Sequence, residues 1–288
     1  MLTRPFRYER AAHYADACDL LREHGDDAKV LAGGQSLLPL INIGLAQPGV
    51  VVDISRLAEG RDITVGADGY LTLGALVTHA RLAADARARS AQPLLPEAAA
   101  HIGNNRVRNR GTLGGSLAHA DPAAELPLVM VALGAAYEVT SGHASRSVRA
   151  EDFHLGFFTT ALAADELIVS VSAPVLGPGW GWSFQEVSRR DGDFAMAAVA
   201  ALVRIADGLV VEARVAAAAV SDRPVRLADV ETALTGCPPG GVADRVGPLQ
   251  GISPAGDAGA SAQYKRRLAR VLVIRALQEA AGRAGEAA

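Results

Sequence analysis

Two adjacent glycines near the start of the chain, in the stretch Ala32-Gly33-Gly34-Gln35-Ser36, constrain its fold more than any other feature. An apolar pair precedes them and an apolar run follows, which predicts a strand, a tight turn and the start of a helix. Glycine permits positive φ and lets a ligand approach the backbone without an intervening Cβ atom. Ser36 stands near the expected N-cap, and Pro39 suits the first helical turn. Free N–H groups and the helix dipole at such a helix start favour an anion, typically a phosphate.

A second stretch of the same character, Gly111-Thr112-Leu113-Gly114-Gly115-Ser116, follows about 80 residues later. Either stretch alone fits a simple tight turn as well as a phosphate site. Two such loops together favour a ligand with two linked phosphates. The polar, basic segment Gly103–Arg110 leads into the second loop and is expected to be a loop itself, either solvated or forming a wall of the ligand site.

Composition excludes several classes of protein. The chain has 288 residues, of which 50% are hydrophobic, so a sizeable core is available. Its net charge of −3 argues against a dedicated nucleic-acid binder. The only lysines are Lys29 and Lys265, and no Gly-Lys-Ser/Thr sequence of a Walker loop occurs. There is no apolar run long enough for a membrane span and no apolar signal-peptide core at Met1–Pro5, so a cytoplasmic protein is expected.

Few residues are candidates for catalysis or metal binding. Cys18 and Cys237 are too few for an iron–sulfur cluster or a zinc site, and Cys18 is interpreted as a core residue of a helix. Asp121 before Pro122 is expected to cap a helix, with Glu125 four residues later on the same side. These carboxylates either belong to the helix start or accept hydrogen bonds from ribityl or ribose hydroxyls. We therefore expect no metal site.

The pattern of apolar residues changes near Gly177-Pro178-Gly179, where we place a domain boundary. Before it, helices and short strands alternate. Beyond it, three consecutive strands are expected to form an antiparallel sheet, with turns at Asp191-Gly192 and Asp207-Gly208, followed by two helices. The expected strands are 182–188, 195–204 and 209–220, and the expected helices are 227–234 and 262–281.

Three ordered blocks resemble the FAD-binding medium subunit of molybdenum hydroxylases, the carbon monoxide dehydrogenase and xanthine dehydrogenase family. Residues 32–39 look like its first FAD-binding motif, and Gly111–Ser116 with Ala120–Pro127 like its second. Phe184–Arg190 with Asp193-Phe194-Ala195 resembles the start of its C-terminal domain. The resemblance covers essentially the whole chain. It implies an α+β fold: a two-lobed α/β FAD-binding domain of the PCMH type over 1–176, then a small domain over 177–288 with a three-stranded antiparallel sheet and flanking helices.

By the same resemblance, the loops at 32–36 and 111–115 bind the FAD pyrophosphate, and Ser116 and Glu125 bind near the ribityl, ribose or adenine end. Ile102 and Ile168 pack on the ring systems. Phe194 is either an aromatic residue beside the isoalloxazine or a core aromatic. The implied cofactor-binding residues are Leu31, Ala32, Gly33, Gly34, Gln35, Ser36, Leu37, Ile102, Gly111, Thr112, Gly114, Gly115, Ser116, Asp121, Glu125, Ile168 and Phe194.

The resemblance implies an electron-transfer subunit rather than a substrate-binding one, so no residue of this chain is expected to be catalytic. Electrons from a molybdopterin large subunit would pass through the [2Fe–2S] clusters of a small subunit to FAD and then to an external acceptor, in a heterotrimer or its dimer. Two positions depart from relatives: Gln35 replaces a frequent histidine, and Gln185 replaces a lysine that some xanthine dehydrogenase-type members carry near the flavin. The alternatives are a stand-alone FAD-dependent oxidase or dehydrogenase of the same fold, and a non-catalytic nucleotide-binding module. A nicotinamide dehydrogenase is disfavoured because Gly-x-Gly-x-x-Gly does not follow the first strand.

Overall fold

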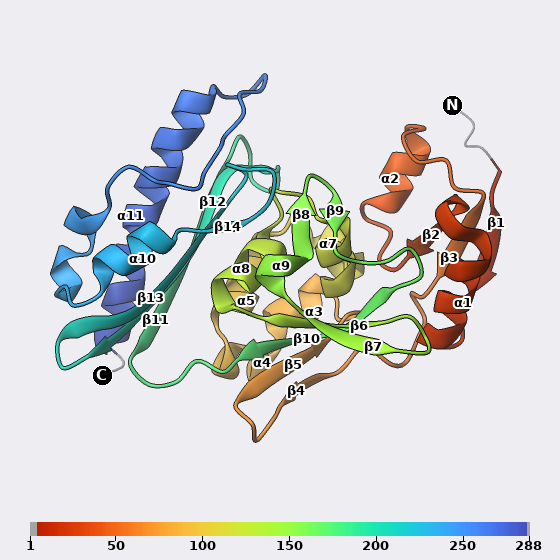
Figure 1. Ribbon diagram of the computed structural model, residues 1–288, viewed down its shortest axis with the longest axis horizontal. Coiled ribbons are helices and arrows are strands. Elements are labelled where there is room, and N and C mark those ends of the chain that lie inside the picture. Colours follow the sequence, from red (N-terminus) through yellow and green to blue (C-terminus); the bar gives the residue numbers. More distant parts are fainter. Residues whose placement is uncertain (1–4, 287–288) are drawn as a thin grey trace.

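The computed structural model describes residues 5–286, so most of the N-terminal stretch used above to argue against a signal peptide lies outside the described residues. Three parts follow one another along the long axis in sequence order (Figure 1). We call them the first lobe (5–57), the second lobe (58–176) and the C-terminal part (180–286). No helix within 5–286 is both long and apolar enough to cross a membrane.

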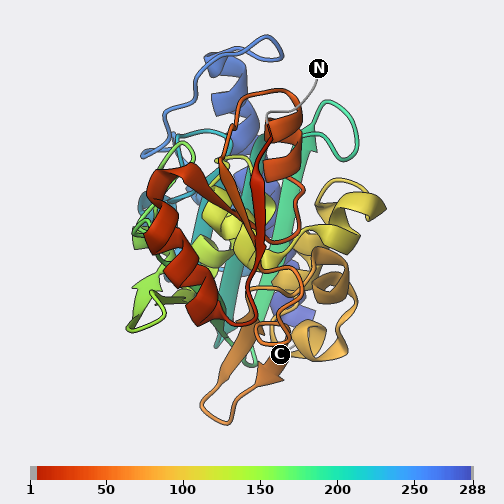
Figure 2. The same cartoon turned by 90° about the vertical axis from the view of Figure 1, so that its right-hand side faces the viewer.

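The first lobe is built on a parallel sheet with strand order β1-β3-β2. It contains β1 (Arg7–Arg10), α1 (Tyr14–His24), the 3-10 turn η1 (Gly25–Asp27), β2 (Ala28–Leu31), α2 (Leu37–Asn42) and β3 (Val50–Asp53). The central strand β3 is buried along its whole length. Helix α1 buries Cys18 with its other apolar residues, as the helical period predicts, and ends at Gly25. Figure 2 looks at the molecule from this side, with α1 and β1 in front.

The second lobe is built on an antiparallel sheet with strand order β4-β5-β10-β6-β7. Its strands are β4 (Ile63–Val65), β5 (Tyr70–Gly74), β6 (Ala136–Thr140), β7 (Ser145–Arg149), β10 (Leu167–Pro174) and the separate pair β8 (His154–Gly156) and β9 (Thr159–Thr160). Its helices are α3 (His79–Ala84), α4 (Ala86–Ala91), α5 (Leu94–His101), α6 (Asn105–Arg110), α7 (Leu113–His119), α8 (Glu125–Leu133) and α9 (Ala150–Phe153). Helix α8 is buried at every position from Leu126 to Leu133 because it packs against strands of both neighbouring sheets.

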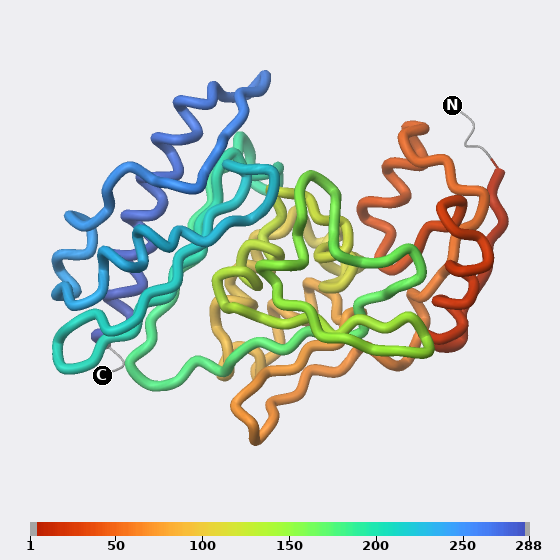
Figure 3. The backbone as a smooth tube through the Cα atoms, viewed as in Figure 1, coloured from red at the N-terminus to blue at the C-terminus, as the bar shows by residue number. Residues whose placement is uncertain are grey.

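The C-terminal part is an antiparallel sheet covered by helices. It contains β11 (Trp180–Ser188), β12 (Ala195–Ala206), β13 (Leu209–Ala218), β14 (Val225–Arg226), α10 (Ala228–Leu234), the 3-10 turns η2 (Pro239–Gly241) and η3 (Ala243–Arg245), and α11 (Ala262–Glu286). Figure 3 shows the chain crossing into this part along the lower edge of the view. Helix α11 lies so close to the sheet that a Cβ atom on Gly181 would stand 1.9 Å from the carbonyl oxygen of Ala280.

Three local expectations were wrong. The C-terminal sheet has a fourth strand, β14, which is too short to show a period of two. The segment expected to be a loop before the second glycine stretch contains helix α6, because the Asn104 side chain accepts hydrogen bonds from the N–H groups of Arg106 and Val107 and thereby caps it. Asp121 does not cap a helix: its carboxylate accepts from the N–H of Ala123, and α8 begins at Glu125.

Candidate functional site

The two glycine stretches lie against each other, although about 80 residues separate them. Gly33 is in contact with the backbone before the second stretch: a Cβ atom there would stand 2.2 Å from the carbonyl oxygen of Arg110 and 2.8 Å from Cα of Gly111. A Cβ atom on Gly115 would reach within 3.9 Å of the Ala32 side chain. Any residue other than glycine at position 33 would therefore force the first and second lobes apart.

The first loop leaves a row of backbone donors available. It follows β2 at the carboxyl edge of the parallel sheet and turns through Gly34, whose φ is +72°. Within 5–286, none of the N–H groups of residues 33–37 donates a hydrogen bond. Ser36 occupies the N-cap position of α2, but its side chain makes no capping bond, so the hydroxyl is available as well. Consecutive free N–H groups beside a helix start form an anion site.

The second loop is arranged differently. The N–H groups of Leu113 and Gly114 donate to the carbonyl oxygens of Val77 and Ala75, and the Thr112 hydroxyl caps α7 by accepting from the N–H of Gly115. A Cβ atom on Gly114 would stand 2.6 Å from Cβ of Ala75. Gly114 lets the second loop pack tightly on Ala75, and Gly115 lets it approach the first loop. The consecutive free N–H groups described above, those of residues 33–37, are in the first loop.

Two carboxyl groups from distant parts of the sequence lie close enough for their charges to interact. Burial, with a smaller contribution from Asp121, raises the pKa of Glu125 to about 7. Burial and the nearby Glu125 raise the pKa of Glu186, on β11, to about 8. Oε2 of Glu186 is buried and has no hydrogen-bond partner among the described residues. A neutral carboxyl group can donate a hydrogen bond as well as accept one, so the pair suits a hydroxyl-rich ligand.

The remaining expected site residues divide into buried and exposed positions. Ile102 and Ile168 are buried, with 8% and 5% of their surfaces exposed, and both belong to the core of the second lobe. Phe194 is 76% exposed, so its interpretation as a core aromatic is wrong. Its ring is available to a ligand or a partner chain.

Gln185 and Glu186 lie on opposite faces of β11, as neighbours in a strand must. The Gln185 amide donates to Oε2 of Glu279 on α11 over 2.7 Å, and the Ser183 hydroxyl donates to the same oxygen. Gln185 is thus held by α11, whereas Glu186 lies near Glu125. Sequence reasoning missed Glu186, which the alternation of apolar and polar residues around Phe184 could have identified.

His79 packs beneath the second loop. A Cβ atom on Gly111 would stand 2.6 Å from its imidazole Cδ2, and the ring is only 5% exposed. Burial lowers the pKa of His79 to about 4, so the imidazole is neutral near pH 7. Its position agrees with a structural rather than an acid–base role for this histidine.

These features fit FAD. The free N–H groups of the first loop and the close approach of the two loops fit a pyrophosphate, and the Glu125–Glu186 pair fits sugar or ribityl hydroxyls. The fit requires no lysine at the phosphates, because backbone donors carry that role. Among the described residues no group of three or more His, Cys, Asp or Glu side chains is placed to hold a metal ion.

Comparisons with known proteins agree with this fit. Residues 4–176 match the FAD binding domain in molybdopterin dehydrogenase, and residues 182–280 match the CO dehydrogenase flavoprotein C-terminal domain. The nicotine 6-hydroxylase medium subunit of Paenarthrobacter nicotinovorans is 38% identical, over 96% of this chain and 98% of that protein. Two solved structures are similar over nearly the full length. Carbon monoxide dehydrogenase from Hydrogenophaga pseudoflava has a TM-score of 0.93 at 34% identity and covers 98% of this chain and 99% of its own.

Quinoline 2-oxidoreductase from Pseudomonas putida 86 has a TM-score of 0.91 at 36% identity, with 99% of each chain covered. The match to both domains, in order and across almost every residue, confirms the resemblance of the three sequence blocks. The chain therefore belongs to the FAD-binding medium subunits of the molybdenum hydroxylases, the FAD-dependent oxidoreductase subunits of the carbon monoxide and xanthine dehydrogenase type.

Proposed function

We propose that this chain is the electron-transfer subunit of a molybdenum hydroxylase complex, receiving electrons from the [2Fe–2S] clusters of a partner subunit and passing them through FAD to an external acceptor. The observation that carries the proposal is the row of free N–H groups at residues 33–37, held against the second glycine stretch. When bound, FAD supplies the redox chemistry, and the chain supplies binding, orientation and electrostatics.

Each site residue has a proposed role. The N–H groups of residues 33–37 and the Ser36 hydroxyl bind the pyrophosphate, flanked by Leu31 and Ala32. Residues 111–116 form the opposite wall of the pyrophosphate site. Glu125 accepts from ribityl or ribose hydroxyls, and Asp121 supports the turn that precedes it. Ile102, Ile168 and Phe194 contact the ring systems.

The proposal also covers the partner subunits of the complex and the division of the chain into two domains. Several relatives are named medium subunits or medium chains, which supports assembly with a small iron–sulfur subunit and a large molybdopterin subunit. The two matched regions leave residues 177–181 between them, which supports a boundary near 177 between an FAD-binding domain over 1–176 and a C-terminal domain over 177–288.

The direct test of the FAD site is the visible absorption spectrum of the chain after FAD is added and excess removed. Gly33→Val and Gly114→Val are expected to lose at least about 90% of the bound flavin, because the new side chain would enter backbone or Cβ positions held by the neighbouring loop. Gly247→Val is the matched control, since nothing lies within 4 Å of a Cβ atom there. Circular dichroism of each variant checks that it is folded. Full flavin retention by folded Gly33→Val would contradict the assignment.

The electron path needs a separate test. Chemically reduced iron–sulfur subunit is mixed with the FAD-loaded chain, and the loss of oxidised-flavin absorbance is followed in a stopped-flow instrument. Flavin reduction by the iron–sulfur subunit supports the proposal. If the FAD-loaded chain alone is reduced by an organic substrate, the stand-alone dehydrogenase is the better description.

A further inference from the structure

Backbone strain gathers at one place in the molecule, the turn 120–124 that precedes α8. Within 5–286, the non-glycine residues with positive φ are Ala120, Phe158, Asp207 and Ala219. Such backbones are uncommon outside glycine and persist only where the surrounding contacts hold them. Asp207 belongs to the turn between β12 and β13, whereas the other three residues meet at the turn 120–124.

Two of these residues donate hydrogen bonds to the turn from other parts of the chain. The N–H of Phe158, between β8 and β9, donates to the carbonyl oxygen of Ala120 over 3.1 Å. The N–H of Ala219, directly after β13, donates to that of Pro122 over 2.8 Å. Nη1 of Arg223 in turn donates to a carbonyl oxygen of β8 over 3.0 Å. The turn, the β8–β9 hairpin and the segment after β13 therefore fix one another.

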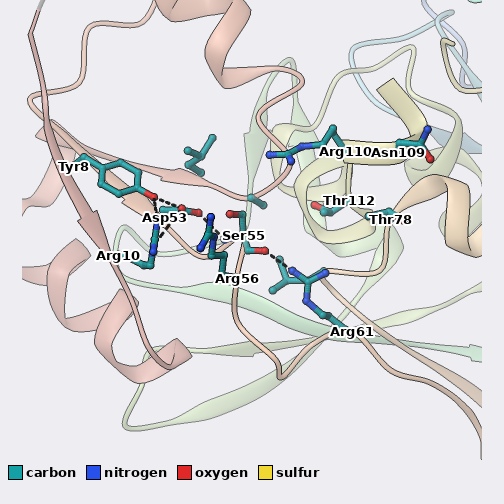
Figure 4. A pocket seen from close by; sticks show the side chains of 13 residues that line it. Tyr8, Arg10, Asp53, Ser55, Arg56, Arg61, Thr78, Asn109, Arg110 and Thr112 are labelled. Atoms are coloured by element: carbon teal, nitrogen blue, oxygen red, sulfur yellow. Dashed lines mark hydrogen bonds and ion pairs between the residues drawn. The ribbon is translucent and has the colours of Figure 1, made fainter. Parts of the chain in front are cut away.

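The turn also joins two helices of the proposed FAD site. Helix α7 begins after Thr112, which lines a cleft between the first and second lobes, and ends at Ala120 (Figure 4). Helix α8 begins at Glu125, and the side chain of its N-cap residue, Ala124, makes no capping bond. A residue with positive φ is common at a helix end, so Ala120 alone carries no inference. The hydrogen bonds from the two other segments are what set this helix connection apart.

Packing of its side chain does not account for the strained backbone of Phe158. The Phe158 ring packs against His119, with 5.1 Å between the ring centroids, but 59% of the residue is exposed. A side chain that remains mostly in water gains little from burial. The contact that requires this backbone is the hydrogen bond to the turn.

We propose that Phe158 and Ala219 are positioning residues, whose positive-φ backbones hold the turn 120–124 so that the Glu125 carboxyl is placed to bind hydroxyl groups of FAD. The inference rests on the proposed function, which assigns Glu125 to the cofactor. The two residues act through the turn and not by touching FAD themselves. Strained backbones that set the geometry of a ligand site are a known way of preorganising it.

The test replaces Phe158, because its exposed side chain leaves room for another one. Phe158→Val puts a β-branched residue at a φ of +50°, which such residues strongly disfavour, whereas Phe158→Gly tolerates this φ and removes only the ring. Asp207→Val is the matched control, because Asp207 is also exposed and its φ is +51°. Ala219→Val and Ala219→Gly repeat the comparison at the second donor.

The first readout is the Kd of FAD, measured by quenching of flavin fluorescence. Phe158→Val should raise the Kd about tenfold or more, since the cost of its backbone is relieved only when the turn moves. Phe158→Gly and Asp207→Val should stay within about twofold of wild type. Urea denaturation of each variant shows how much its fold is weakened, and Phe158→Val and Asp207→Val should be weakened alike.

The second readout needs no FAD. Burial and the charge of Asp121 raise the pKa of Glu125, and Glu186 interacts with it, so the unfolding equilibrium constant of the FAD-free chain should rise between about pH 4.5 and about pH 8. If Phe158→Val moves Glu125 toward water, its pKa falls back toward the ordinary value. The rise should then shrink about tenfold or more, whereas Asp207→Val should keep the wild-type rise.

Equal FAD affinities of Phe158→Val and Asp207→Val would overturn the proposal. An equal loss of affinity in Phe158→Gly would also overturn it, because the ring and not the backbone would then be responsible. If wild type binds no FAD, the proposed function fails, and the FAD-free readout decides the inference: equal rises in Phe158→Val and Asp207→Val overturn the placement of Glu125 by the turn, and a smaller rise in Phe158→Val supports it. If Phe158→Val does not fold, Ala219→Val against the same control gives the answer.

Discussion

Glu186 is the residue whose environment is least explained by the fold alone. One of its carboxylate oxygens is buried without a hydrogen-bond partner in the described chain, and burial also raises the pKa of a nearby carboxyl group in the second lobe, that of Glu125. An orphaned polar atom costs free energy unless a ligand satisfies it. A hydroxyl of bound FAD would provide that partner, and we therefore propose Glu186 as an addition to the expected cofactor-binding residues.

The Glu125–Glu186 pair predicts a pH dependence of stability in the FAD-free chain. The folded-state pKa values of about 7 and about 8 exceed the ordinary value of 4.5, so the folded chain holds protons that the unfolded chain releases. The free energy of unfolding should therefore fall as the pH rises from about 4.5 to about 8. Glu186→Gln removes one of the two titrating groups, so the decline should become shallower.

Urea denaturation at several pH values measures this decline. Glu23→Gln is the matched control, because the Glu23 side chain is 66% exposed. An identical decline in wild type and Glu186→Gln would show that the pair does not titrate in this range.

At single positions, sequence reasoning succeeded where a residue's own chemistry decides the outcome. Both glycine stretches were expected to serve one ligand, because glycine allows a close approach to the backbone, but their direct contact with each other was not predicted. The exposure of the Phe194 side chain and the absence of a helix cap at Asp121 could not be predicted, because both depend on neighbours that the local sequence does not identify. Glu186 was missed because Glu125, the carboxyl group that interacts with it, lies 61 positions earlier in the sequence.

At the scale of elements, the Arg283 side chain on helix α11 forms hydrogen bonds that link the C-terminal part to the second lobe. Nη1 of Arg283 donates to Oε2 of Glu97 on α5 and to the carbonyl oxygen of Trp182, each over 2.9 Å. Nη2 donates to Glu279 in the preceding turn of α11. Glu97 also accepts from the Trp182 indole over 2.9 Å and from the N–H of Phe184 over 3.2 Å, so one carboxylate joins α5, β11 and α11.

Arg283→Met keeps a long apolar stem beside Trp182 but removes these donors. We expect it to lower the free energy of unfolding by about 1–3 kcal/mol, since Glu97 and Glu279 each lose a charged partner. Urea denaturation measures the loss, and Arg267→Met serves as the control for removing an exposed arginine from the same helix. Equal stability of the two variants would mean that the linkage does not stabilise the chain.

Strands β11 to β13 and helices α10 and α11 were predictable because their apolar periods are regular and glycine-containing turns separate them. The elements that were missed include short or polar ones. A two-residue strand has no period, and α6 is polar along its whole length, so its formation depends on the Asn104 cap and the surrounding lobes rather than on an apolar stripe.

At the scale of the molecule, the proposed FAD site spans the junction between the first and second lobes, so cofactor binding should stabilise both of them. At a free FAD concentration of about 100 times its Kd, linkage predicts a gain of about 2.7 kcal/mol in unfolding free energy. Thermal unfolding followed by circular dichroism should show one higher transition for the wild type with FAD, and no shift for Gly33→Val. If FAD raised the unfolding temperature of the second lobe and left that of the first lobe unchanged, the first loop would not take part in FAD binding.

The contact between Gly33 and Arg110 also sets an order of events during synthesis. The first loop leaves the ribosome about 80 residues before its partner backbone does, a delay of roughly 4 to 16 seconds at the usual pace of about 5–20 residues per second. Until residues 110–116 emerge, the N–H groups of residues 33–37 are present in the nascent chain, but the second glycine stretch, which lies opposite them in the folded protein, is not. At the proposed site, flavin capture therefore comes after translation of the second glycine stretch, and the first loop alone does not complete the binding site.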